Sequence, residues 1–193
     1  QFLIRNGWDP KTSRDPYKLF VYTSFQERAT KVSHGNVGRV AEKEGDKTLA
    51  KICTTIAADE AKHESAYKQF FAECLKLDPD GSMVTFKEML ETKITMPAAY
   101  MEDGVTENLY DVFSVVAQRM KVYTAKDYAD IIQHLVEYWE IPNVSGLSEK
   151  GREAQDYICN MARRYSRLAE RTQTRLISKG SPVSFPWIFG RTA

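Results

Sequence analysis

Apolar residues recur every three or four positions along most of this chain, and few stretches alternate strictly between apolar and polar. That spacing is typical of helices that bury one face, whereas a strand repeats every two residues. The pattern predicts an all-α protein. We expect helices at residues 20–44, 46–77, 82–90, 106–121, 124–140 and 148–177.

Capping residues and breaks set the predicted helix ends. Asp46, Ser82, Thr106 and Thr124 stand where a side-chain oxygen accepts from the first free backbone amides of a helix. Residues 78–81 read Asp-Pro-Asp-Gly, a strong turn signal between two helices.

Length and charge narrow the class of protein. With 193 residues and a net charge of +1, the chain fits one domain over residues 1–193, with no overall field that favours nucleic acid. Its apolar runs fall short of the roughly 20 residues that span a bilayer, so we expect no membrane insertion.

Three widely spaced cysteines indicate buried thiols in a reducing compartment. The amino terminus, without Met or a signal segment, reads as though cut from something longer.

The second predicted helix carries acidic and imidazole groups on its buried stripe. Positions 49, 53, 56, 60, 63, 67, 70 and 74 follow steps of three and four, and Glu60 and His63 lie in the middle of this stripe. An ionised carboxylate facing a helical core is costly unless it is paired or bound to a metal. On a solvent-facing side a single E-x-x-H would be noise; here it favours a metal site.

The preceding helix repeats the pattern with Glu27, Thr30 and His34 among apolar residues. Two antiparallel helices would bring Glu27 opposite Glu60 and His63. Carboxylates with imidazole suit iron or manganese. Thr30 and His34 also fit as satisfied polar groups of the core, which we favour for His34.

These residues make only half of a ferritin-like di-iron site. Such sites use one Glu from each of two helices and an E-x-x-H from each of two others. No second E-x-x-H occurs, because Lys31 precedes His34 and Ile131 precedes His134 at that spacing. We therefore interpret His134 as structural.

The chain resembles the plant-type stearoyl-acyl-carrier-protein desaturases over nearly its whole length. The residues that carry the resemblance are YTSFQERAT at 22–30, TIAADEAKHE at 55–64, VYTAKDYAD at 122–130, GLS at 146–148, AQDY at 154–157 and WIF at 187–189. Long ungapped agreement of this kind is far more specific than ligand spacing. It implies a ferritin-like di-iron bundle, of which residues 17–77 form the second half.

The resemblance also implies roles for individual residues. Glu27 and His63 would be terminal ligands and Glu60 would bridge two irons. Asp59 would orient a ligand, and Thr30 would face the oxygen-binding side and assist proton delivery. The remaining Glu and the second E-x-x-H lie upstream in this family. The expected reaction is desaturation of an acyl chain on acyl carrier protein, with O2 and ferredoxin electrons, in a homodimer of the plastid stroma.

Substrate and docking positions follow from the same resemblance. Leu19, Thr23 and Tyr110 match positions along the acyl channel, and Lys93 and Asp111 match positions near its mouth. Common stearoyl members usually have glycine where Leu19 stands, so we expect another specificity, such as a shorter acyl group. Simple packing of Leu19 against a neighbour is an equal alternative.

Two further alternatives concern surface and function. Arginines 163, 164, 167, 171 and 175 fit either a basic surface for acidic acyl carrier protein or an ordinary solvated face. The function alternatives are another ferritin-like di-iron oxidase or hydroxylase, and a non-catalytic helical module.

Overall fold

The computed structural model describes residues 14–177, with side chains through residue 171, and within that range it is helical without strands. The α-helices are α2 (Pro16–Lys43), α3 (Lys47–Leu77), α4 (Pro79–Glu91), α5 (Leu109–Arg119), α6 (Ala125–Tyr138) and α7 (Glu149–Ile177). Two 3-10 turns, Pro97–Tyr100 and Ile141–Asn143, lie between them. The predicted all-α class is confirmed.

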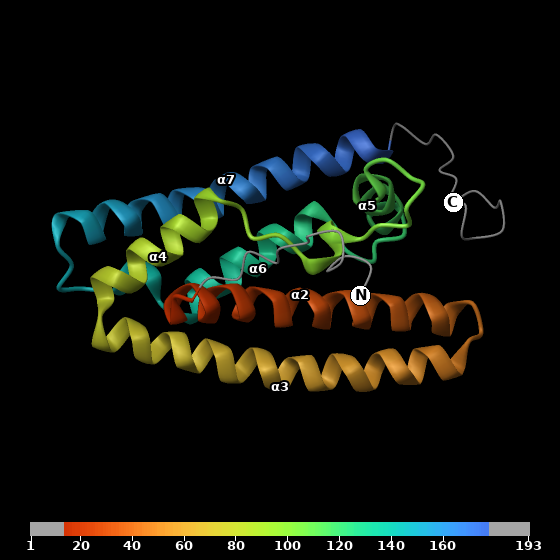
Figure 1. The fold of residues 1–193 in the computed structure, drawn as a ribbon, viewed down its shortest axis with the longest axis horizontal. Coiled ribbons are helices and arrows are strands. Elements are labelled where there is room, and N and C mark those ends of the chain that lie inside the picture. Colours follow the sequence, from red (N-terminus) through yellow and green to blue (C-terminus); the bar gives the residue numbers. More distant parts are fainter. Residues whose placement is uncertain (1–13, 178–193) are drawn as a thin grey trace.

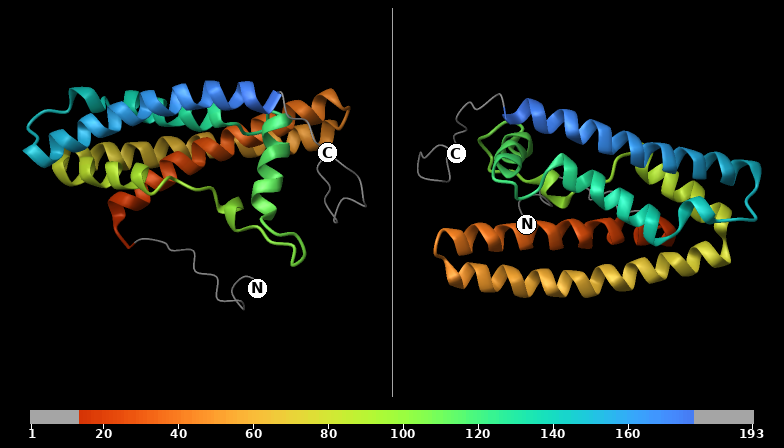
Figure 2. Two further views of the ribbon diagram at one scale, coloured as in Figure 1. Left: turned by 90° about the horizontal axis from the view of Figure 1, so that it is seen from above. Right: turned by 180° about the vertical axis from the view of Figure 1, so that it is seen from behind.

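The neighbouring helices α2 and α3 form an antiparallel hairpin along one side of the molecule (Figure 1). The hairpin turns at Gly45, whose positive φ of 88° suits a residue without Cβ. Helices α4, α6 and α7 form a second layer, with α7 packed on both α4 and α6. Figure 2 shows α5 running across the bundle axis at one end.

The core lies between these two layers. Val21, Phe25 and Ala29 of α2 and Phe71 of α3 are fully buried against apolar side chains of α4, α6 and α7. Trp139 completes the contact, because its ring lies 4.4 Å from that of Phe71 and its Nε1 donates to Lys68 O at 3.0 Å. This core fixes the inner faces of α2 and α3 and leaves their opposite faces uncovered in the described part of the chain.

Some predicted boundaries are confirmed by their caps. Asp46 accepts from the Leu49 amide at 2.9 Å, and Thr124 forms a reciprocal capping box with Asp127. The first helix begins earlier than predicted, at Pro16, because Asp15 caps it through the Tyr17 amide.

Two other boundary predictions are wrong. Residues 79–81 belong to the first turn of α4, which Asp78 caps, so Ser82 is a buried helical residue rather than a cap. Pro79 stands at the first helical position, where its missing N–H costs nothing. Thr106 also caps no helix: it bonds to Asp103, and α5 begins at Leu109.

The prediction of buried cysteines is confirmed for two of the three, since Cys159 is only partly buried. All three cysteines are free, and Cys53 and Cys74 are buried. Among the described residues, no helix combines the length and the apolar character needed to cross a membrane.

Candidate metal centre

Three potential metal ligands meet where α2 and α3 pass one another. Glu27 of α2 and Glu60 and His63 of α3 each offer a ligand atom within 4.8 Å of the others. His63 Nδ1 lies 3.3 Å from Glu27 Oε2 and 3.5 Å from Glu60 Oε2. The predicted juxtaposition of Glu27 with the E-x-x-H pair is therefore present.

The backbone explains why these side chains meet. Residues three apart on a helix share a face, which brings Glu60 and His63 together. The hairpin then places α2 alongside. The two helices pack closely, since a Cβ added at Gly38 would lie 3.3 Å from Cys53 Cβ.

The carboxylates are crowded and partly withdrawn from water. Their side chains are 19% and 18% exposed for Glu27 and Glu60, and that of His63 is 58% exposed. Burial, together with the neighbouring Glu60, raises the pKa of Glu27 to about 7. The hydrogen bond with Glu27 lowers the pKa of Glu60, and burial only partly opposes it. A divalent cation bound between the two carboxylates would relieve this crowding.

The predicted stripes are only partly buried. His63 is exposed, as are Leu49 and Phe70 of the α3 stripe, although Cys53 and Cys74 of that stripe are buried. The site thus opens on the face of the hairpin turned away from the core.

Thr30 and Asp59 are close in sequence to the three potential ligands, but their side chains bond to other groups. Thr30 Oγ1 donates to its own helix backbone, 3.0 Å from the carbonyl oxygens of both Gln26 and Glu27. Asp59 is exposed and accepts from Lys62 Nζ at 2.9 Å. Their predicted roles stay predictions.

The predicted substrate and docking residues lie outside this cluster. Leu19, in the first turns of α2, is 46% exposed, and Thr23 follows one turn later, partly buried. Tyr110 is partly buried in α5, and burial raises the pKa of its phenol. Lys93, with a positive φ of 61°, and Asp111, in the first turn of α5, are exposed.

The predicted basic surface lies on the outer side of α7. Arginines 163, 164, 167 and 171 are exposed, and the side chain of Arg175 lies outside the described residues. The partner of this surface stays a prediction.

Sequence reasoning missed Glu64, which follows His63 but faces the core. Its side chain is only 2% exposed and contacts Arg28, Lys68 and His134. The predicted structural role of His134 is thus supported by contacts. A signal existed in the sequence. The helix carries a second stripe with steps of three and four, formed by Ala50, Cys53, Ala57, Ala61, Glu64, Lys68, Phe71 and Leu75. Its small residues made it less conspicuous than the stripe beside it.

The fold and this cluster define a helical bundle with a group of two carboxylates and a histidine that could hold a metal ion. The chain belongs to the fatty acid desaturase family, whose model matches residues 1–189. It is 54% identical over 191 residues to stearoyl-acyl-carrier-protein 9-desaturase 1, chloroplastic, of Arabidopsis thaliana, covering 99% of this chain and 48% of that protein. The corresponding proteins of Olea europaea and Ricinus communis are each 52% identical, with 99% of this chain covered and 49% and 48% of theirs. The chain spans about half the length of these curated relatives.

Proposed function

We propose that residues 1–193 form one domain, the carboxy-terminal part of an acyl-carrier-protein desaturase. The protein would introduce a cis double bond into a saturated acyl chain carried by acyl carrier protein. The observation that carries the proposal is the Glu27, Glu60 and His63 cluster, in a chain 54% identical to a relative named as a stearoyl desaturase.

The three residues fit iron. Two carboxylates and one imidazole form a hard, oxygen-rich donor set, which suits iron better than a thiolate-preferring metal. In the proposed site Glu27, Glu60 and His63 would hold the iron, Glu27 and His63 as terminal ligands and Glu60 as a shared one, together with ligands from outside these residues. When bound, the irons supply, with O2 and two electrons, an oxidant strong enough to attack an unactivated methylene pair.

Residues around the cluster would prepare and protect this chemistry. The Thr30 hydroxyl, one helical turn from Glu27, would move a proton on the oxygen-binding side after release from its backbone acceptors. Asp59 would orient a ligand once it exchanges its contact with Lys62. Leu19, Thr23 and Tyr110 would line the acyl channel. Because the side chain of Leu19 is larger than the glycine usual in stearoyl members, it would favour a shorter acyl group.

The proposed desaturase activity also implies partner proteins. Acyl carrier protein would dock near Lys93 and Asp111, and the exposed arginines of α7 would add attraction for an acidic protein. Ferredoxin would supply electrons to a homodimer. The curated relatives are named chloroplastic, which supports the plastid stroma as the location.

The test is a product assay on the full-length protein. Purified enzyme receives acyl carrier proteins loaded with saturated chains of increasing length, a reduced ferredoxin system and O2, and the products are analysed by mass spectrometry. A mono-unsaturated acyl product supports the desaturase. A hydroxylated product would instead identify a hydroxylase, and iron-loaded protein without any product would reject both.

Leu19 provides a sharper test of specificity. The wild-type enzyme should prefer a chain shorter than stearoyl, and Leu19→Gly should shift the preference to a longer one. An enzyme that prefers stearoyl and is unaffected by Leu19→Gly would contradict this role.

A further inference from the structure

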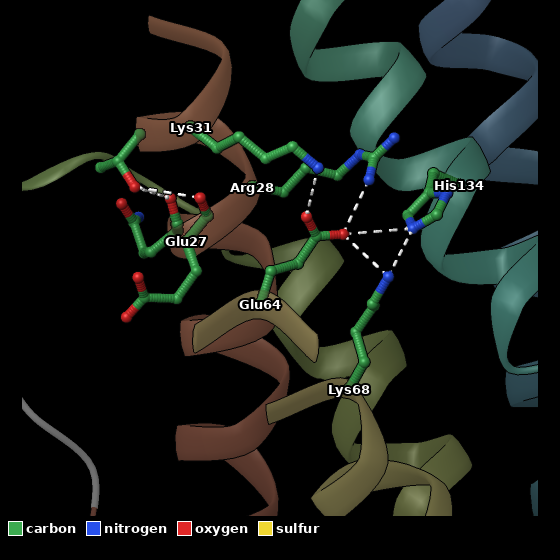
Figure 3. Close-up of polar contacts among 8 residues, drawn as sticks. Glu27, Arg28, Lys31, Glu64, Lys68 and His134 are labelled. Carbon is green, nitrogen blue, oxygen red and sulfur yellow. Dashed lines mark hydrogen bonds and ion pairs between the residues drawn. The ribbon is translucent and has the colours of Figure 1, made fainter. Parts of the chain in front are cut away.

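Glu64 is a buried carboxylate that contacts cationic side chains of α2 and α3 and a histidine of α6. Arg28 Nη1 and Lys68 Nζ lie 2.7 and 2.8 Å from Glu64 Oε1, and Lys31 Nζ lies 3.1 Å from Oε2. His134 Nε2 is 3.3 Å from Oε1. We call these five residues the Glu64 cluster; Figure 3 shows its members converging from α2, α3 and α6.

The cluster lies directly behind the candidate metal centre. Arg28 follows Glu27 on α2, and Glu64 follows His63 on α3. Consecutive helical residues point about 100° apart, so each helix places one side chain in the metal centre and the next in the cluster. Figure 3 shows Glu27 on one side of α2 and Arg28 reaching the other way toward Glu64.

This arrangement ties the two ligand-bearing helices together at the level of the ligands. The Arg28–Glu64 and Lys31–Glu64 contacts both cross from α2 to α3. Charge-assisted hydrogen bonds to a buried carboxylate are short and directional, so sliding or separation of the helices there would leave buried charges unpaired. Lys68 holds the same carboxylate from α3 itself, and the Lys68 ammonium also contacts His134 Nε2 of α6 at 2.9 Å.

We propose that Glu64 is a positioning residue for the metal centre, which it serves by fixing the spacing and register of α2 and α3 where Glu27 and His63 meet. The inference rests on the proposed metal site and deepens it. A metal centre tolerates only small errors in ligand placement, and residues that orient ligands commonly change metal affinity 10- to 100-fold. Glu64 touches no ligand, so its effect passes through the backbones of the two helices.

A purely stabilising ion-pair cluster would behave differently. Its loss would lower the stability of the whole fold, and metal binding would weaken only as far as the fold loosens. The test therefore compares Glu64→Gln with a destabilising core variant in the second layer. Ile158→Ala serves, because Ile158 is fully buried in α7, which packs on α4 and α6.

The experiment uses the full-length protein and Co(II) as the probe. Anaerobic titration gives the dissociation constant, and the ligand-field absorption of the bound ion reports its coordination geometry. We expect Glu64→Gln to raise the dissociation constant at least about tenfold and to shift the absorption bands, whereas Ile158→Ala changes neither beyond about twofold.

Arg28 variants provide a second reading should Glu64→Gln fail to fold. Arg28→Lys keeps the charge and should lose only part of the affinity, and Arg28→Met should match the loss in Glu64→Gln. Equal Co(II) affinity and bands in wild type, Glu64→Gln and Arg28→Met would overturn the positioning role. Absence of Co(II) binding by the wild type would instead overturn the metal site itself.

Discussion

Lys68 Nζ lies 2.9 Å from His134 Nε2, so a buried ammonium and an imidazole meet across α3 and α6. The ammonium can only donate, and Nε2 therefore accepts, with the ring proton on Nδ1. The same ammonium lies 4.2 Å from the centre of the Tyr138 ring and 2.8 Å from Glu64. This set of contacts joins the hairpin to the second layer.

Replacing His134 should therefore weaken the contact between layers. We expect His134→Leu to lower the free energy of unfolding by about 1–2 kcal/mol, because Lys68 loses an acceptor in a mostly buried place. Denaturant titration measures the loss, and the nitrogen chemical shifts of the wild-type ring at mildly alkaline pH report the Nδ1-protonated tautomer. The control Gln133→Leu removes only a contact with Glu137 on the same helix and should cost less. A ring protonated on Nε2 would contradict the assignment.

Loss of a metal ligand should abolish metal binding with little effect on the stability of the metal-free fold. Glu60→Gln should abolish tight metal binding by the full-length protein, while the metal-free stability changes by about 1 kcal/mol or less, because the side chain is partly solvated. Metal content after dialysis and thermal unfolding of the metal-free form give the two readings. Glu73→Gln is the matched control on the same helix, since Glu73 is exposed and pairs with Lys76. Equal metal content in the two variants would exclude Glu60 as a ligand.

Two glycines of α2 should respond differently to alanine. A Cβ at Gly35 would meet nothing within 4 Å, whereas at Gly38 it would lie 3.3 Å from Cys53 Cβ and 3.5 Å from Ala50 O. Alanine in a helix interior gains about 0.5–1 kcal/mol over glycine. We expect that gain for Gly35→Ala in denaturant unfolding, and no gain or a loss for Gly38→Ala, because α3 would have to move. Equal gains at both sites would show that the hairpin is looser than described.

Tyr123 should govern stability at alkaline pH. Its hydroxyl is buried without a hydrogen-bond partner, and burial raises the pKa of the phenol well above its usual range. The unfolded chain releases this proton near pH 10 and the folded chain keeps it, so the contribution to stability is complete below that pH and is lost above it. The loss from this one group approaches about 1.4 kcal/mol per pH unit.

Tyr123→Phe should remove that loss. At neutral pH the variant should unfold at the same free energy or up to about 1 kcal/mol higher, since an unsatisfied buried hydroxyl has been removed. The two proteins should diverge only above about pH 10, with the wild type falling faster. Parallel pH profiles would show that the Tyr123 phenol reaches water in the folded protein.

The sequence was most informative where one helix face carries both large apolar and chemically distinctive side chains. The 3.6-residue period located α2 and α3, and the Glu27, Glu60 and His63 juxtaposition followed from pairing them. The buried role of Glu64 was not predicted, because several residues of its stripe are alanines and because its partners Arg28 and His134 come from other helices. No local pattern encodes such contacts.

The prediction of a turn at residues 78–81 was wrong because the same residue types can form either a turn or the start of a helix. Asp78, Pro79 and Gly81 are typical of a turn, yet Asp followed by Pro also begins a helix, with Asp as the cap and Pro at the first position. The packing of Met83 and Phe86 into the core favours the helical alternative. Local residues left both open, and tertiary burial decided between them.

One carboxylate ties the beginnings of two helices. Asp80, in the first turn of α4, accepts from both the amide and the hydroxyl of Ser148, and the Ser148 hydroxyl in turn accepts from the Gly151 amide at the start of α7. A Cβ at Gly151 would collide with this carboxylate. This corner therefore caps two helices at once, and a change to it would loosen the starts of α4 and α7 together, which are two of the three helices of the second layer.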